Sequence, residues 1–180
     1  WLMIAAGDDR QHGGNDGYAD QLSRQYRWDD TVPNHAAVAA GDAIVLWDKR
    51  RLLGASTIER IQTASGLKSR YRCPRRHCGQ TKIKARVKKQ PRYRCHECGQ
   101  EFDVPEVEMI GVTEYWTSHG SGWVDLEGIL GGPRLRDLCE QPKSQHAMRR
   151  LRWTDFAVTI AATGLAPLGF TDLANAHQTP

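Results

Sequence analysis

The chain has 180 residues, of which 39% are hydrophobic, so it suffices for one domain with one modest core and, at most, a small insertion. Its mean hydropathy of −0.60, without an apolar run approaching about 18 residues, excludes an integral membrane protein. Residues 1–6 are too short for a signal peptide, and the five cysteines do not suggest a disulfide scaffold. We therefore expect a cytoplasmic protein with no membrane partner.

The N-terminal part reads as a strand followed by irregular chain. Residues 1–6 are apolar and predict a first strand, while the Gly- and Asp-rich residues 11–20 predict a loop. Residues 26–35 mix aromatic and polar side chains without a helical or strand period. We therefore predict neither a helix nor a strand for this stretch, and its side chains are candidates for a functional site.

A hairpin is expected next. The turn at Gly41-Asp42 precedes the continuous apolar run 43–47, which predicts a strand buried on both faces. Residues 49–51 form a basic turn, and residues 52–61 predict the partner strand.

Four cysteines follow at the spacing of a zinc ribbon. Cys73 and Cys78 form one pair, and Cys95 and Cys98 form a second pair after sixteen intervening residues. Two thiolate pairs on separate turns can close a tetrahedral Zn²⁺ site with no open position, which is the structural type of zinc site. The sequence therefore predicts a structural zinc ion held by these cysteines.

Two histidines and the fifth cysteine also have to be considered as metal ligands. His77 and His96 are alternative ligands that would each replace one cysteine, although both stand beside complete pairs. The fifth cysteine, Cys139, is expected to be a buried apolar residue of a short helix.

The ribbon is also the most basic part of the chain. Residues 68–100 hold twelve Lys and Arg and one acidic residue, Glu97, which gives a formal charge of +11. Four thiolates and one Zn²⁺ would lower this to about +9. Because the whole chain is only +4, everything else sums to −7. Such concentrated charge is the footprint of a nucleic-acid contact, although a charge run is also an ordinary solvated face. The candidates for contacts to the nucleic-acid backbone are Arg70, Arg72, Arg75, Arg76, Lys82, Lys84, Arg86, Lys88, Lys89 and Arg92.

The chain after the ribbon returns to strands and then to helices. Residues 107–116 and 123–126 predict strands. Residues 133–140 and 144–151 predict short helices.

The C-terminal part predicts one more helix. Thr154 is a good N-cap for a helix over residues 155–163, which Gly164 ends. Residues 166–180 contain Pro, Gly, Asn and His without periodicity and predict a loose tail.

These elements predict a mainly β protein with peripheral helices (α+β), built as a small, partly open barrel that carries an inserted zinc ribbon. We place the barrel in residues 1–66 and 104–165 and the ribbon in residues 67–103. The barrel would be interrupted by the ribbon after its hairpin.

Several short motifs resemble those of a known family. Residues 41–61 (GDAIVLWDKRRLLGASTIERI) resemble the "GD, apolar strand, turn, G-x-x-x-I" hairpin of PUA-like barrels, especially of the EVE and YTH branches. Residues 1–4 match the first strand of those barrels. Tyr26, Trp28 and residues 32–35 match the stretch that helps to build a pocket for one modified base in those families.

With the inserted cysteines, the pattern is similar to the DNA-reading domain found ahead of HNH nuclease domains in bacterial modification-dependent restriction proteins. The resemblance covers roughly residues 1–152. It implies a bacterial reader of double-stranded DNA that flips a modified base, foremost 5-methylcytosine or another 5-substituted cytosine, into an aromatic pocket. The seven histidines lack the ββα-metal spacing of an HNH nuclease. We therefore expect no enzyme activity and, where DNA is cut, a nuclease domain or subunit acting in trans.

A flipped base needs a flat apolar platform and polar contacts along its edge. Under the resemblance, the candidates for this pocket are Tyr26, Trp28, Asn34, His35, Trp47, Asp48 and Trp116. Trp28, with Trp47 or Trp116, would supply the platform, while the three polar residues would supply the edge. Large aromatics are also core residues by default, and Pro-Asn-His is also a turn whose side chains bond to the backbone.

Other functions remain open from the sequence. A PUA-like protein that binds tRNA, rRNA or modified RNA is the main alternative. A nuclease with an unrecognised site and a protein–protein adaptor are two more, although no catalytic motif stands out.

Overall fold

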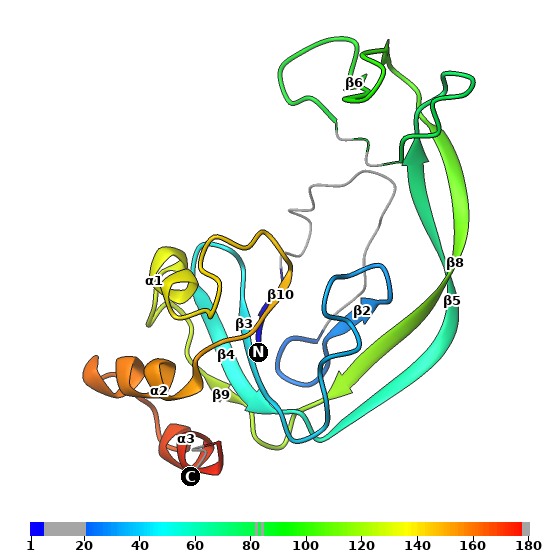
Figure 1. The fold of residues 1–180 in the computed structure, drawn as a ribbon. Helices are drawn as coiled ribbons and strands as arrows, with labels where there is room; N and C mark the ends of the chain where they lie inside the picture. The colour runs from blue at the N-terminus through cyan, green and yellow to red at the C-terminus, as the bar shows by residue number, and fades with distance from the viewer. Residues whose placement is uncertain (6–20, 82, 84, 178–180) are drawn as a thin grey trace. The chain divides into compact units, whose positions relative to one another are not determined.

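The computed structural model describes residues 1–5, 21–81, 83 and 85–177. The protein is mainly β, with open sheets and a few helices (Figure 1), which confirms the predicted class at that level. The chain divides into two compact units. The described residues of the first unit are 1–5, 21–64 and 113–177, and those of the second lie within 65–112.

The first unit is built on a five-stranded sheet with the strand order β10-β1-β3-β4-β9. Its strands are β1 (Leu2–Ile4), β3 (Ala43–Trp47), β4 (Leu52–Thr57), β9 (Val124–Asp125) and β10 (Met148–Arg149). β1 runs parallel to β3 and antiparallel to β10, whereas β3 and β4 form the predicted antiparallel hairpin. The short edge strands β9 and β10 come from chain segments far from the hairpin in sequence.

Every residue of β3 is buried, because both faces of the sheet are covered. Val45 and Trp47 face one hydrophobic cluster, while Ile44 and Leu46 face another. The alternation of a strand thus sends successive apolar side chains into two cores. This confirms the expectation of a strand buried on both sides.

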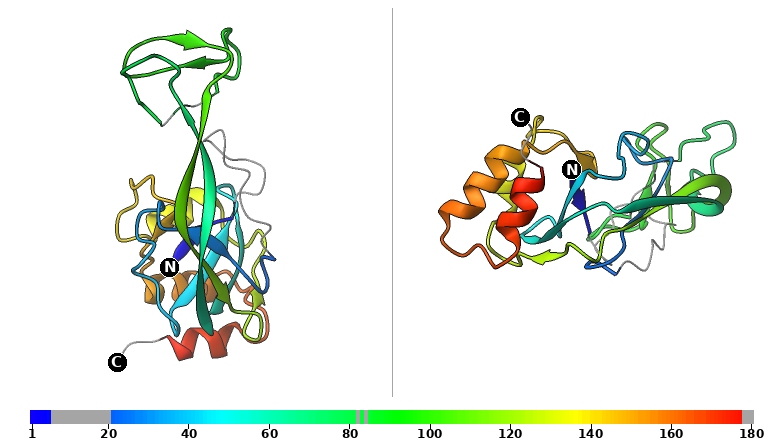
Figure 2. Two further views of the ribbon diagram at one scale, coloured as in Figure 1. Left: turned by 90° about the vertical axis from the view of Figure 1, so that its right-hand side faces the viewer. Right: turned by 90° about the horizontal axis from the view of Figure 1, so that it is seen from below.

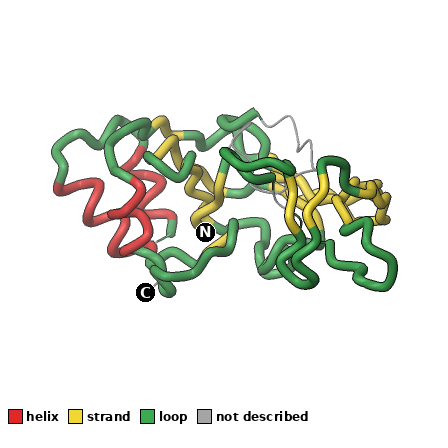
Figure 3. Tube along the Cα trace, turned by 90° about the horizontal axis from the view of Figure 1, so that it is seen from above, coloured by secondary structure: helices red, strands yellow, loops and turns green. Residues whose placement is uncertain are grey.

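Helices cover one face of the five-stranded sheet. α1 (Gly132–Asp137), α2 (Trp153–Ala162) and α3 (Phe170–Ala176) gather on one side of the strands (Figures 2 and 3). Leu135, Phe156, Ile160 and Phe170 from these helices join the cluster that contains Trp47.

The opposite core involves a second sheet with the order β2-β8-β5, formed by β2 (Arg27–Asp29), β8 (Glu106–Ser118) and β5 (Arg60–Arg72). Tyr26 and Trp28 pack with Met3, Ile44 and Leu46 in this core. The neighbouring strands β5 and β8 are long and twist around each other (Figure 2). The boundary between the two units falls within both of these strands.

Two predictions for the C-terminal part are wrong. Residues 144–151 do not form a helix, because Met148 and Arg149 pair with β1 as the edge strand β10. Residues 166–180 are not a loose tail throughout, since α3 lies within them and buries Phe170, Leu173 and Ala174. In both places, contacts with the first unit's core decide the local structure.

The other boundaries differ by a few residues. Residues 52–61 are not one strand, because β4 ends at Thr57 and β5 begins at Arg60. α2 begins at Trp153 with Arg152 as its N-cap, so the N-cap predicted at Thr154 is wrong. Gly164 follows the helix with a φ of 68°, as expected of a glycine that ends a helix. The loop predicted over residues 11–20 lies outside the described residues.

Candidate metal centre and polar cavity

The second unit brings the four predicted cysteines together. The sulfur atoms of Cys73, Cys78, Cys95 and Cys98 all lie within 4.8 Å of one another. The Sγ atoms of Cys73 and Cys98, and those of Cys78 and Cys95, are 3.7 Å apart. Four sulfurs around one ion at about 2.3 Å would be separated by about 3.8 Å in a tetrahedron. The four thiols therefore form a cage of the right size for a metal ion.

The two cysteine turns share one backbone design. The N–H of Cys73 donates to the carbonyl of Gln80 over 2.8 Å, and the N–H of Cys95 donates to that of Gln100 over the same distance. Gly79 and Gly99, with φ angles of 66° and 72°, follow the second cysteine of each turn. This left-handed conformation suits glycine and lets each turn fold back under its sulfurs.

This symmetry was readable in the sequence. Both turns begin with Tyr-Arg-Cys, at residues 71–73 and 93–95, and both end with Cys-Gly-Gln, at residues 78–80 and 98–100. This short repeat was missed in the prediction of the metal site. It would have indicated two related halves around one site.

The thiols sit in unequal environments. The backbone N–H of Gln100 lowers the pKa of the Cys98 thiol to about 6. Burial raises the pKa of Cys73 to about 12. A bound cation would favour the thiolate form of all four, because metal ligation requires deprotonated sulfur. His77 and His96 are both exposed, and neither belongs to the cluster of possible metal ligands among the described residues.

A small apolar core supports the cage. Tyr93 of β6 (Tyr93–Arg94) stacks on Phe102 of β7 (Glu101–Phe102) and meets Tyr71 edge to face. Ile83 is fully buried beside Cys73 and Cys95. The unit thus has too few apolar residues for a large core, which is the situation in which a metal contributes to folding.

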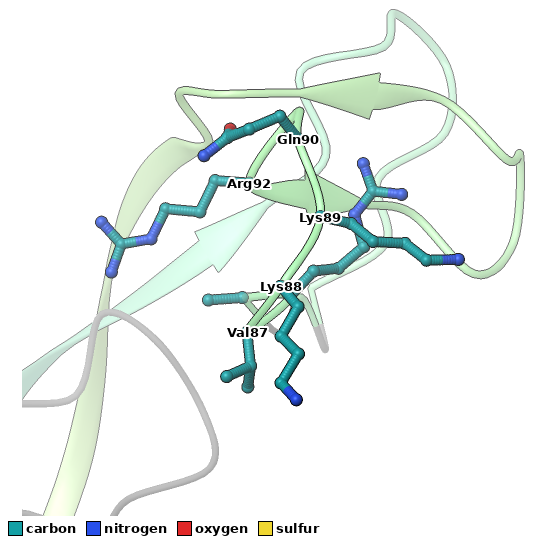
Figure 4. A pocket seen from close by; sticks show the side chains of 7 residues that line it. Val87, Lys88, Lys89, Gln90 and Arg92 are labelled. Carbon is teal, nitrogen blue, oxygen red and sulfur yellow. The ribbon is translucent and has the colours of Figure 1, made fainter.

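A basic loop projects from this unit. Residues 85–90 and Arg92 line a hollow of about 600 Å³, shown in Figure 4. Arg86 donates to the carbonyl of Pro91 and pairs with Glu101 over 2.6 Å, so it holds the loop in shape. Lys88, Lys89 and Arg92 are exposed around it.

The predicted backbone contacts divide into two groups. Arg70 and Arg86 are engaged in ion pairs, with Glu108 and Glu101 respectively. Several other cations of the second unit are exposed and have no ion pair among the described residues: Arg72, Arg75, Arg76, Lys88, Lys89, Arg92 and Arg94. Lys82 and Lys84 lie outside the described residues.

The predicted platform residues of the base pocket are largely internal. Trp28 is only 2% exposed, and its ring stacks on Tyr115 at 5.5 Å and on Tyr26 at 6.1 Å. Its Nε1 donates to the carbonyl of His35. Tyr26 donates through its hydroxyl to the carbonyl of Ile4. Both rings therefore have neighbours on the faces that a base would use.

Trp47 and Asp48 are not members of this aromatic stack. Trp47 is fully buried, with the guanidinium carbons of Arg136 and Arg149 at 5.5 Å and 5.4 Å from its ring. Asp48 accepts the N–H groups of Arg50 and Arg51 and fixes the turn of the hairpin. Both residues thus have structural partners.

Two partly exposed aromatics come closer to a platform. Trp116 is partly exposed and donates to Gln62 over 3.0 Å. Tyr115, which the sequence analysis did not select, is also partly exposed and lies 5.8 Å from the His35 ring. Its place opposite Trp28 in the strand register was hidden in the sequence, because the two residues are far apart along the chain.

Asn34 lies on a cavity of the first unit. Its backbone has a φ of 70°, and its Nδ2 donates to the carbonyl of Met148 over 2.9 Å. The Nδ1 atom of its neighbour His35 lies 3.1 Å from the carbonyl of Val32. The interpretation of this stretch as a turn whose side chains bond to the backbone is thus confirmed.

The cavity beside Asn34 has a volume of about 330 Å³ and a mostly polar lining. The other lining residues come from the loop before β10, from that strand and from the residue after it: Glu140, Gln141, Ser144, His146, Met148, Arg149 and Arg150. Because a helix was expected here, sequence analysis did not select any of these residues.

Comparisons with protein-family models, with curated proteins and with solved structures find no match. Within the ranges that the structure describes, every helix is too short or too polar to cross a lipid bilayer. Fold and site define the molecule by class: a mainly β protein with a four-cysteine cage on a strongly basic unit.

Proposed function

We propose that the chain is a nucleic-acid-binding module that reads a modified base in double-stranded DNA, foremost a 5-substituted cytosine. The observation that carries the nucleic-acid part is the set of exposed cations on the caged second unit that form no ion pair with any described residue, of which Lys88, Lys89 and Arg92 border one hollow. Lys and Arg side chains in this state can bind phosphates without competition from internal carboxylates.

Zn²⁺ is the ion that we propose for the cage of Cys73, Cys78, Cys95 and Cys98. Four thiolates in a tetrahedron suit Zn²⁺, and such closed sites hold shape and leave no position for a reacting water. The role of the metal would then be to keep the basic loop in a fixed geometry. Zinc content measured on the purified protein tests this assignment, with one ion per chain expected.

The base-reading part rests on the resemblance of the hairpin and of residues 26–35 to PUA-like readers. The side chains that we propose for the pocket differ from those expected from the sequence. Since Trp28 is covered on its ring by Tyr115, we propose the partly exposed Tyr115 and His35 as the aromatic surface and Asn34 as the edge contact. Trp28 would support this surface from the core.

The test is a titration of matched duplexes by fluorescence anisotropy at physiological salt. The duplexes carry cytosine, 5-methylcytosine or 5-hydroxymethylcytosine at one position in the same sequence. Tighter binding to a modified duplex supports the reader, whereas equal affinity for all three contradicts it. An RNA of the same sequence competes in a further arm, and its preferential binding would favour an RNA-binding protein instead.

We also propose that the chain reads and does not cut, with any cleavage carried out by a nuclease domain or subunit in trans. Incubation of the full chain with modified plasmid and Mg²⁺ or Mn²⁺ checks this, and intact plasmid is the expected result. Cleavage that copurifies with the protein and is abolished by a substitution in this chain would show that the chain itself cuts DNA.

A further inference from the structure

We propose that the cavity beside β10 is an anion site that binds a phosphate group through Arg149 and Arg150. The cavity, of about 330 Å³, lies entirely in the first unit. It is larger than a phosphate and leaves room for part of the group that carries it.

Arg149 is the main observation. Its side chain is only 4% exposed, yet its Nε and Nη1 atoms have no hydrogen-bond partner among the described residues. A buried guanidinium normally has acceptors for its donors, because an unpaired buried charge is costly. Arg149 also lines the cavity, so an anion bound there would bring negative charge and acceptor oxygens next to this residue.

The surroundings of Arg149 are rich in donors and positive charge. Arg136 lies near the same Trp47 ring as Arg149, and the buried Nε1 of Trp47 also lacks a partner within the described ranges. No salt bridge joins Arg136, Arg149 or Arg150 to a carboxylate in the described part of the chain. Cation–π contact with Trp47 stabilises the Arg149 charge without neutralising it.

The remaining lining adds further polar contacts for an oxyanion. Ser144 and His146 come from the loop that folds back over β10, with the N–H of Glu140 donating to the carbonyl of Arg150 over 3.1 Å. Asn34, whose Nδ2 donates to the carbonyl of Met148, also lines the cavity. Among the described residues that line the cavity, Glu140 is the one acidic side chain, against two arginines. The balance therefore favours an anion.

A phosphate is the anion that this arrangement suits best. A guanidinium presents its donors in a fork that matches two oxygens of one phosphate. The phosphate can belong to a nucleic-acid strand or to a free mononucleotide. The first source rests on the proposed function, whereas the second does not.

The experiment uses the full chain in phosphate-free buffer, with NaCl titrated as the control for ionic strength. Inorganic phosphate, a nucleoside 5′-monophosphate and a dinucleotide with only an internal phosphodiester are titrated while the melting temperature and the ³¹P NMR linewidth are followed. We expect a saturable rise of the melting temperature beyond that in NaCl. A response to the dinucleotide indicates the nucleic-acid source, and a response to the monophosphate alone indicates the free nucleotide.

Arg149→Lys keeps the charge and loses the fork, so phosphate binding should weaken about tenfold, which corresponds to about 1.4 kcal/mol. Arg150→Met should weaken it as well and affects an exposed side chain, so it carries the test if Arg149→Lys does not fold. Arg134→Met is the matched control, because Arg134 is exposed on α1 and does not line the cavity. Unchanged binding in the folded cavity variants, or no saturable response of the wild type to any probe, overturns the site.

The same variants are titrated with the modified duplexes. Phosphate binding without preference for modified DNA would leave the anion site standing and remove the proposed function. Preference for modified DNA without any response to the three phosphate probes would support the proposed function and overturn the anion site.

Discussion

Trp28 and Tyr115 lie opposite each other on β2 and β8, with ring centroids 5.5 Å apart and ring planes 8° from parallel. Trp28 is buried, whereas Tyr115 keeps part of its surface exposed. Cross-strand aromatic pairs of this kind stabilise a sheet beyond the area that they bury. The pair therefore separates two roles: the inner ring holds the sheet, and the outer ring remains available to a ligand.

Replacing Trp28 with Ala should lower the free energy of unfolding by about 3–5 kcal/mol, because a large buried side chain is removed and a cavity is left. Urea denaturation followed by tryptophan fluorescence measures this. Tyr115→Ala should cost less stability and, if the reader proposal holds, should reduce the preference for modified DNA. Trp28→Ala with wild-type stability would contradict the structural role of this residue.

Loss of the metal should unfold the second unit and spare the first. Cys95→Ser removes one of the two most buried ligands of the cage, so we expect less than one metal ion per chain and faster hydrogen exchange in residues 65–112. The five-stranded sheet should keep its protection, because its cores contain none of these cysteines. Metal analysis and hydrogen exchange read out the two effects.

Cys139→Ala is the matched control for this experiment. Cys139 is fully buried in the first unit, and its Sγ lies 3.5 Å from the carbonyl of Leu135. Its replacement should leave the metal content unchanged. Equal metal content in Cys95→Ser and Cys139→Ala would show that the cage does not hold the ion.

What was predictable from the sequence was local. The cysteine cage and the β3–β4 hairpin depend on spacing within short segments, and both were predicted correctly. The helix α3 also left a signal, since Phe170, Leu173 and Ala174 have the spacing of one helical face. The Pro and Gly content of the surrounding residues obscured it.

The polar cavity was not predictable in the same way. It needs Asn34 next to Met148, and these residues are 114 positions apart. It also needs Met148 and Arg149 to pair with β1 as a strand, within the stretch where a helix was predicted. Tertiary pairing overrides local propensity here, and a single sequence does not display that pairing.

The basic loop should set the salt dependence of nucleic-acid binding. Each lost phosphate contact lowers the slope of log K against log salt by about 0.9 for B-DNA. The double variant Lys88→Ala and Lys89→Ala should therefore reduce the slope by about 2 while the protein keeps its fold, because both side chains are exposed. Anisotropy titrations at several NaCl concentrations give the slope.

Arg134→Ala combined with Lys143→Ala provides the matched control for charge. Both side chains are exposed, and both residues belong to the first unit. The control should lower the overall charge equally and change the slope less. An equal loss in both double variants would assign the effect to net charge and would contradict a contact by the loop.

The last prediction concerns the pH dependence of stability through His119. This residue is fully buried, its Nε2 donates to the carbonyl of Leu22 over 2.9 Å, and its Nδ1 lies 2.7 Å from the Thr117 hydroxyl. Thr117 also accepts the N–H of Tyr26, so its own proton is free to bond Nδ1 only while the imidazole is neutral. Burial accordingly lowers the pKa of His119 below its ordinary value.

A lowered pKa in the folded state means that the unfolded chain takes up this proton first as the pH falls. The stability contributed by neutral His119 is thus complete above about pH 6.5 and is lost below it, by at most about 1.4 kcal/mol per pH unit. In His119→Gln, which has no titrating group, the free energy of unfolding should fall less steeply between about pH 6.5 and 5 than in the wild type. Urea denaturation at a series of pH values measures both slopes. The other histidines are common to the two proteins and cancel in the comparison, so identical slopes would show that His119 is not held neutral by the fold.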